Sequence, residues 1–303
     1  MAISLTEAAK LSQDQLRRGV IETIVEESPL MQRLPFQNVQ GNAYAYVREA
    51  SLGDAAFRAV NQGYTPSEGS FSEHSAKLTI LGGDADVDRF IVQTQGDQVA
   101  EVRAAMTAQK AKAVRLAFHD AFINGDGTSN SFEGVNKMIA GTAQELDAEG
   151  MKIVGASSDD RQAFFDALDE LIAAVGGRPS MLLMNSKTLA KVKSAARRES
   201  AYDETRDDFG RAIVAYQGIP LVDAGYNEQN APIIPHDPEA GDSIFAVRLA
   251  EDGVLGLTNG GVQVYDLGEL DDKPVFRTRI EFYCGLVLIK QDAAAVLRNV
   301  VAG

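Results

Sequence analysis

One stretch of the chain, residues 50–76, is too polar to contribute to a hydrophobic core. It holds Gly53, Gly63, Pro66 and several serines, with few large apolar side chains. A segment of this length without core residues must run over the surface or project from it. The flanking residues 43–49 and 77–91 have the apolar alternation of strands. We therefore predict two strands that enclose a polar tip and form a long hairpin arm.

The composition indicates a globular chain with an acidic surface. Of the 303 residues, 45% are apolar and 24% are charged, and the formal net charge is -14. Basic residues cluster only in pairs such as Arg17–Arg18 and Arg197–Arg198, so sequence-specific binding of nucleic acid is not expected. The single cysteine, Cys284, excludes an intrachain disulfide and is expected to be a buried thiol. No apolar run resembles a signal peptide or a membrane span, so we expect folding in a cytoplasm.

Periodicity and capping signals predict the remaining elements. Helices are expected over residues 4–27, 97–122, 158–175 and 186–198. The second of these would be a rod of about 40 Å, with its buried face along Val99, Val102, Met106, Ala113 and Ala117. Strands are expected over residues 181–184, 212–216, 219–223, 243–248, 262–266 and 275–290, and a short helix over residues 293–300. No βαβ unit repeats, which indicates an α+β fold.

Four motifs then follow one another along the chain. They are a glycine-rich turn (NGDGT at 124–128 and FEGV at 132–135), a strand–Met–Asn–helix element (LLMNSKTL at 182–189), a strand of the form QGIPLV at 217–222, and a final long strand at 275–289. In this order, behind an N-terminal arm and a long hairpin, they resemble the major capsid proteins of tailed bacteriophages. Herpesvirus shells and encapsulin compartments share the fold of that family.

The resemblance implies a domain plan and a function. It places an N-terminal arm at residues 1–42, an extended hairpin loop at 43–92, an axial domain at 181–261, and a peripheral domain with a long spine helix at 93–180 and 262–303. It implies a structural protein of the virion, assembled in the host cytoplasm from identical subunits in hexamers and pentamers. Portal and scaffold or decoration proteins would be partners. Double-stranded DNA would be enclosed without sequence-specific contacts, and no membrane, cofactor or enzymatic activity is expected.

Two groups of residues are candidate sites. Gly125, Gly127 and Gly134 are predicted to form a structural turn in which glycine supplies positive φ. A calcium loop is disfavoured there, because Ser129 stands where such a loop needs glycine and Val135 where it needs glutamate. The second group is a charged loop expected to be solvated or, if the resemblance holds, to face its copies around a ring axis. Its candidate residues are Arg197, Arg198, Asp203, Asp207 and Asp208.

Catalytic and metal chemistry find little support in the sequence. His74, His119 and His236 are far apart and have no ligand-spaced partners, and one cysteine with this histidine spacing does not predict a Cys/His metal site. No phosphate loop, Gly-x-Ser-x-Gly elbow or His-Glu-x-x-His motif occurs. Two alternatives to a phage shell remain open: an encapsulin-type compartment that houses a cargo enzyme, and an enzyme with an acidic catalytic pair.

Overall fold

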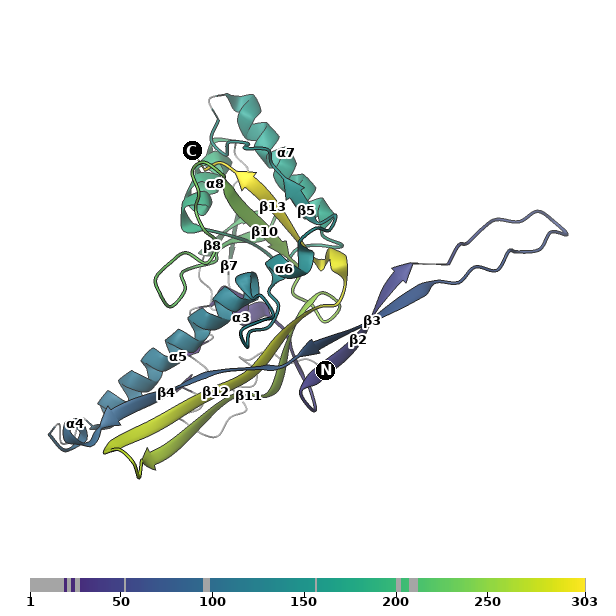
Figure 1. Ribbon diagram of the computed structural model, residues 1–303. Coiled ribbons are helices and arrows are strands. Elements are labelled where there is room, and N and C mark those ends of the chain that lie inside the picture. Colours follow the sequence, from purple (N-terminus) through teal and green to yellow (C-terminus); the bar gives the residue numbers. More distant parts are fainter. Residues whose placement is uncertain are drawn as a thin grey trace.

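The computed structural model describes residues 19–20, 23–24, 28–51, 53–94, 99–155, 157–199, 203–206 and 212–302. Helices and strands alternate irregularly, which confirms the α+β class. Two sheets build the body, and a two-stranded ribbon projects from it to one side (Figure 1). Most of the helix predicted at residues 4–27 and the first residues of the helix predicted at 97–122 lie outside the described residues.

A seven-stranded mixed sheet forms one half of the body. Its order is β5 (Glu145–Asp147), β13 (Ala294–Val300), β10 (Asp242–Val247), β6 (Met181–Met184), β9 (Ile219–Asp223), β8 (Ala212–Tyr216) and β7 (Asp203–Arg206). The pairs β6–β9 and β5–β13 are parallel and the others antiparallel. Strand β6 is buried at all four positions. A continuous apolar run of this kind is expected where both faces of a sheet are covered.

The two faces of this sheet are covered by different helices. On one face, Leu182 and Met184 share a core with α7 (Ser158–Ala174) and α8 (Ser186–Arg198). On the other face, Met181 and Leu183 share a core with the long helix α5 (Val99–Asn124). Helix α7 begins with a capping box between Ser157 and Asp160, and Asn185 caps α8. Both helices agree with the predicted ranges.

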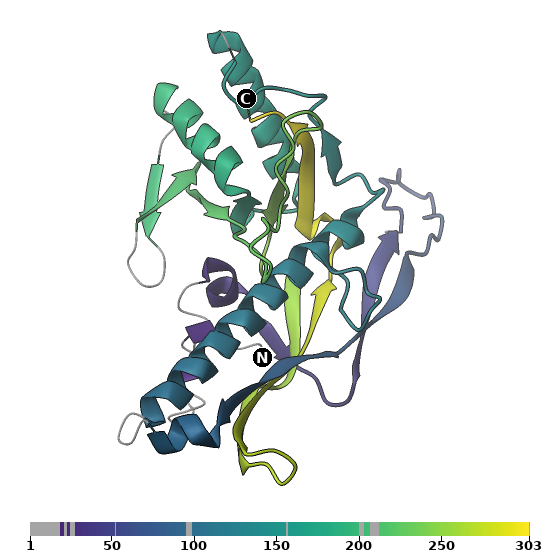
Figure 2. The same cartoon turned by 60° about the vertical axis from the view of Figure 1, so that its left-hand side comes forward.

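A four-stranded sheet with the order β1, β11, β12, β4 forms the other half, and α5 runs along it (Figure 2). The strands are β1 (Phe36–Asn38), β11 (Val254–Glu269), β12 (Val275–Leu288) and β4 (Thr79–Asp88). The short helices α3 (Pro29–Arg33), α4 (Arg89–Thr94) and α6 (Val135–Ile139) and the 3-10 turn η2 (Gln291–Ala293) connect these elements. Four phenylalanines meet between sheet and helix, with ring centroids 5.6 to 6.1 Å apart: Phe36, Phe118, Phe132 and Phe282.

The buried face of α5 differs from the predicted one. Met106 is 42% exposed, whereas Ala111, Val114, Phe118 and Phe122 are buried. The prediction followed small side chains spaced about four residues apart. The structure buries the adjacent face because it carries the two large aromatic side chains, which remove much more apolar surface from water.

Two further corrections concern strands. The predicted helix at residues 293–300 is the strand β13, which pairs with β10 and β5 on its two sides. The predicted second hairpin strand at residues 77–91 is β4, which pairs with β12 along its length. The hairpin partner is instead β3 (Ser70–Lys77), paired with β2 (Ala43–Ser51). In each case a partner strand far away in the sequence determines the structure, and local propensity does not report it.

Sheet membership also departs from the domain plan expected for residues 262–303. Strand β13 joins the sheet of residues 181–247, and β11 enters the four-stranded sheet already at Val254. The N-terminal residues Val20 and Ile24 are buried in the chain's own main core. They therefore pack within the subunit.

A hydrogen bond joins the N-terminal part of the chain to α5. Ser28 Oγ lies 2.6 Å from His119 Nε2 and accepts the Met31 N–H at 3.0 Å. Desolvation of the His119 ring, and next the charge of Arg115, lower the pKa of His119 to about 3. In the unfolded chain its pKa is near 6.5. The folded state therefore keeps this ring neutral where the unfolded chain takes up a proton.

Mild acid should weaken the fold through His119. As the pH falls below about 6.5, the unfolded chain is protonated and the folded one is not, so the free energy of unfolding should decrease. We expect a loss of about 1–2 kcal/mol between pH 7 and pH 5, before carboxylates titrate in the unfolded chain. Urea denaturation at the two pH values measures it. His119→Gln should remove most of this loss and His74→Gln should not; equal loss in all three proteins would contradict the assignment.

Candidate assembly surface

The projecting ribbon is the most distinctive surface of the molecule. Strands β2 and β3 pair only with each other in the described chain, and residues 53–69 form an exposed tip. Phe57 is fully exposed, Val60 is 87% exposed and Tyr64 is 67% exposed. The sequence suggested a polar tip, and these three apolar side chains were missed. Their spacing of three and four residues was the available signal.

The solvent-facing side of the ribbon adds Val47 and Phe71, both exposed. A monomeric protein seldom displays several large apolar side chains on one arm, because water solvates them poorly. A two-stranded ribbon is also only marginally stable alone. These features indicate a surface that is covered when the protein works.

Arg48 anchors the ribbon to the body. Its guanidinium donates to the carbonyl oxygens of Leu288 and Ile289 and, at 2.8 Å, to Gln291 Oε1. The ring of Tyr46 lies 5.5 Å from the guanidinium and stacks on His74. The base of the arm is thus held by polar contacts to the end of β12, while its tip extends freely.

The glycine-rich turn closes on itself at the end of α5. Gly134 N–H donates to the Gly125 carbonyl at 2.8 Å, and the backbones of Asp126 and Glu133 form an isolated antiparallel β-bridge. Of the three predicted glycines, only Gly127 has positive φ, at 67°. At the other two positions glycine is needed because a side chain would not fit. A Cβ at Gly125 would lie 2.3 Å from the Phe132 carbonyl oxygen, and a Cβ at Gly134 would lie 2.6 Å from the Ile123 carbonyl oxygen. The predicted positive φ is therefore wrong for two of the three glycines.

Substitution at this turn should be costly. Gly125→Ala places a methyl group against two backbone carbonyls, Phe132 and Ala121, that cannot retreat without breaking the turn. We expect destabilisation by about 1–3 kcal/mol in chemical denaturation. Gly63→Ala is the matched control, because nothing lies within 4 Å of the added carbon. Similar stability of the two variants would show that the turn accommodates the added methyl group at position 125.

The structure describes only part of the charged loop that contains Arg197, Arg198, Asp203, Asp207 and Asp208. Arg197 and Arg198 are exposed at the end of α8. Asp203 begins β7, which pairs with β8, so part of the expected loop is a strand. Asp207 and Asp208 lie outside the described residues. The juxtaposition of these charges between copies stays a prediction.

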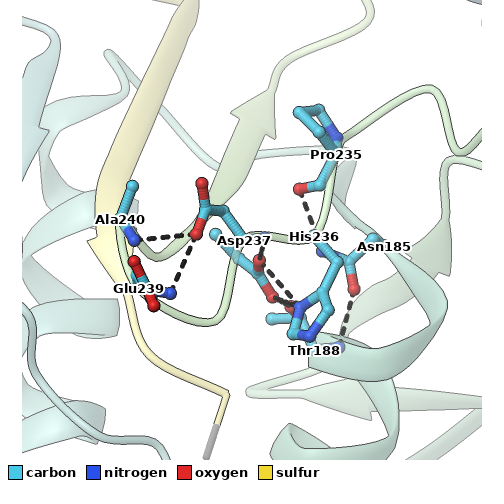
Figure 3. Close-up of polar contacts among 8 residues, drawn as sticks. Asn185, Thr188, Pro235, His236, Asp237, Glu239 and Ala240 are labelled. Carbon is cyan, nitrogen blue, oxygen red and sulfur yellow. Dashed lines mark hydrogen bonds and ion pairs between the residues drawn. The ribbon is translucent and has the colours of Figure 1, made fainter.

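A buried carboxylate organises one loop beside α8 (Figure 3). Asp242 is fully buried and accepts hydrogen bonds from the Thr188 hydroxyl, from His236 Nδ1 at 3.0 Å and from Asp237 N–H at 2.9 Å. Burial would raise the pKa of Asp242, but these hydrogen bonds outweigh it and lower the pKa. The Asn185 side chain caps α8 through Thr188 N–H. The network pins residues 235–242 to the helix, and the sequence showed no sign of it.

The described residues contain no metal-ligand cluster that the sequence missed. No three His, Cys, Asp or Glu side chains among them are placed to hold a metal ion. Cys284 is buried, as predicted, and burial raises the pKa of its thiol to about 12. In the part of the chain that the structure describes, no helix is long and apolar enough to cross a membrane.

A body of two sheets, a long helix and a projecting arm with uncovered apolar side chains defines a shell-forming protein. The chain belongs to the phage capsid family, whose model matches residues 9–299. It is therefore a structural protein of the capsid type. A curated relative is the type 2A encapsulin shell protein SrpI of Synechococcus elongatus, 27% identical over 146 residues. That match covers 45% of this chain and 44% of the relative.

Solved structures show the same fold. The chain of the holo-SrpI encapsulin complex from Synechococcus elongatus superposes with a TM-score of 0.69 at 17% identity, covering 100% of this chain and 97% of that one. The chain from Mycobacterium phage Bobi gives 0.63 at 16% identity, covering 99% and 98%. The capsid of a native GTA particle gives 0.63 at 15% identity, covering 92% and 90%.

Proposed function

We propose that this protein assembles into the icosahedral head of a tailed bacteriophage and encloses its double-stranded DNA. Identical subunits would form hexamers and pentamers, joined by a portal and by scaffold or decoration proteins. The subunit would act in the virion after assembly in the host cytoplasm, without enzymatic activity. In this architecture the arm of residues 43–77 overlies a neighbour, and the domain of residues 181–261 lies near the ring axis.

The observation that carries the proposal is the arm with its uncovered apolar tip. An arm on one side of a subunit that binds a different surface of the next subunit makes a head-to-tail contact. Such contacts close into rings when the rotation permits. The net charge of -14 supports DNA retention by enclosure, because an acidic surface gains little from phosphate contacts.

Electron microscopy of the purified protein, alone and with the scaffold of its own genome, tests the proposal. We expect closed shells, and unassembled subunits that do not bind duplex DNA at physiological salt. A compact monomer in light scattering at all concentrations and ionic strengths would contradict shell formation. Tight binding of duplex DNA by free subunits would contradict retention by enclosure.

The similarity to SrpI favours one alternative, an encapsulin-type compartment. Both the partial sequence match and the superposition over nearly the whole chain support it. The content of shells purified from the native source decides between the two. Packaged DNA indicates a phage head, and an enclosed protein cargo indicates a compartment.

The charged loop offers a test of whether copies of the subunit face one another around a ring axis. Reversing Asp207 and Asp208 to Lys should slow ring formation, most strongly at low salt, because exposed pairs are worth only about 0–1 kcal/mol each and are screened. Reversing Arg197 and Arg198 to Glu in the same chain should partly restore the rate. Light scattering measures it. If the combined variant assembles no better than the first, these charges are a solvated surface only.

A further inference from the structure

A groove separates the base of the arm from the glycine-rich turn. It has a volume of about 640 Å³ and is walled on one side by β2 and β3 and on the other by residues 127–133. Its charged lining consists of Arg48, Lys77 and Lys137 against the single carboxylate Glu133. In a chain of net charge -14, this is a local excess of positive charge beside an element that already serves assembly.

The basic groups of the groove are incompletely neutralised within the subunit. Arg48 donates to carbonyl and amide oxygens and to the Tyr46 hydroxyl, which are all uncharged acceptors. Lys77 is exposed and forms no salt bridge with a described residue. Lys137 lies 3.4 Å from Glu133 and also donates to the Asp126 carbonyl oxygen, so Glu133 is the one carboxylate of the lining and it faces three cations. The groove therefore suits a ligand that brings carboxylates.

The opposite end of the molecule carries such groups. Glu269 ends β11, and the turn to β12 holds Asp271 and Asp272 beside the one cation Lys273; all four side chains are exposed. Glu269 pairs with Arg89 at 2.9 Å, but Asp271 and Asp272 form no salt bridge with any described residue. The turn stands at the tip of two long strands, clear of the body (Figure 1).

The turn cannot reach the groove of its own subunit. Leu286 of β12 lines the groove, whereas Val275 begins β12 at the turn. Extended strands rise about 3.3 Å per residue, so roughly 35 Å separate the two sites along one rigid element. Any contact between them joins two copies, and because the two surfaces differ, it is of the head-to-tail kind that closes into rings or shells.

We propose that the basic groove beside the arm receives the acidic β11–β12 turn of a second copy of this chain. Asp271 and Asp272 of one subunit then face Lys77 and Lys137 of the next. This rests on the proposed function, since it names one contact by which the shell is built. Charge complementarity at this contact would set the register between neighbouring subunits and accelerate their encounter.

Cysteine crosslinking in assembled particles tests the contact directly. A chain with Asp271→Cys and Lys77→Cys should give a ladder of disulfide-linked subunits on mild oxidation, and native Cys284 is buried and unreactive. The matched control replaces Lys77→Cys by Glu73→Cys, an exposed site farther along the same strand that does not line the groove. We expect no ladder there. Shells that form but give no ladder with the first pair would overturn the groove contact and leave the proposed function standing.

Charge reversal gives a second, independent readout. Asp272→Lys should slow assembly at low salt by about fivefold, which corresponds to roughly 1 kcal/mol. Adding Lys77→Glu should restore most of the rate. Glu170→Lys, an exposed site on α7 with the same charge change, should have little effect. Equal assembly rates for Asp272→Lys and Glu170→Lys would mean that only the net charge matters. That result would overturn the contact. A wild-type chain that never assembles would overturn the proposed function itself.

Discussion

Replacing residues 52–69 by a two-residue Asn-Gly turn should leave a folded subunit that no longer forms shells. The described residues 53–69 are all exposed and none belongs to a core cluster. Their removal costs the core nothing, and loop tips of this kind tolerate deletion. We expect assembly to fail because the variant lacks the exposed apolar side chains of Phe57, Val60 and Tyr64, which the proposed function places against a neighbouring subunit. We expect an unchanged circular dichroism spectrum and at least a tenfold loss of assembled particles.

The longer deletion of residues 52–76 is a harsher form of the same experiment. It also removes β3, so β2 loses its partner, yet the anchor at Arg48 and the body remain. We expect this variant to stay folded as well. Unfolding of either variant, seen by circular dichroism, would mean that the arm is part of the subunit's own stability and is not a projecting contact.

Phe118→Ala should be among the most destabilising single substitutions in the chain. The ring is fully buried and touches Phe36, Phe132 and Phe282 from three different elements. Truncating a buried phenylalanine costs about 3–5 kcal/mol, through lost transfer energy and the cavity left behind. This is a large part of the stability of an ordinary domain. The midpoint of urea denaturation should shift accordingly.

Phe57→Ala is the control for that experiment, because it is the same substitution on a fully exposed ring. Stability should change by less than about 0.5 kcal/mol, whereas shell formation should weaken. Together the two variants separate folding from assembly. If Phe57→Ala lowered the denaturation midpoint as much as Phe118→Ala, the tip would have to pack on its own subunit.

The candidate site was predictable in its location more than in its chemistry. The polar composition of residues 50–76 indicated a projecting arm, and the glycines at 125–134 indicated a tight turn. The groove between them was not predictable, because its walls come from segments about 50 residues apart that only the fold brings together. The anchor at Arg48 depends likewise on partners distant in the chain, and so does the contact of the buried Asp242 with Thr188. The roles of Arg197, Arg198, Asp203, Asp207 and Asp208 remain predictions.

Features that rest on near neighbours along the chain could be predicted from local sequence signals. Helix α8 and strand β6 have the predicted bounds because the Asn185 cap and a continuous apolar run are local signals. Only the tertiary structure decided that β4 joins β12, that residues 294–300 form a strand, and that α5 buries its aromatic face. These strands pair with partners distant in the sequence, and burial follows from which elements pack against a helix. Neither is encoded in local periodicity.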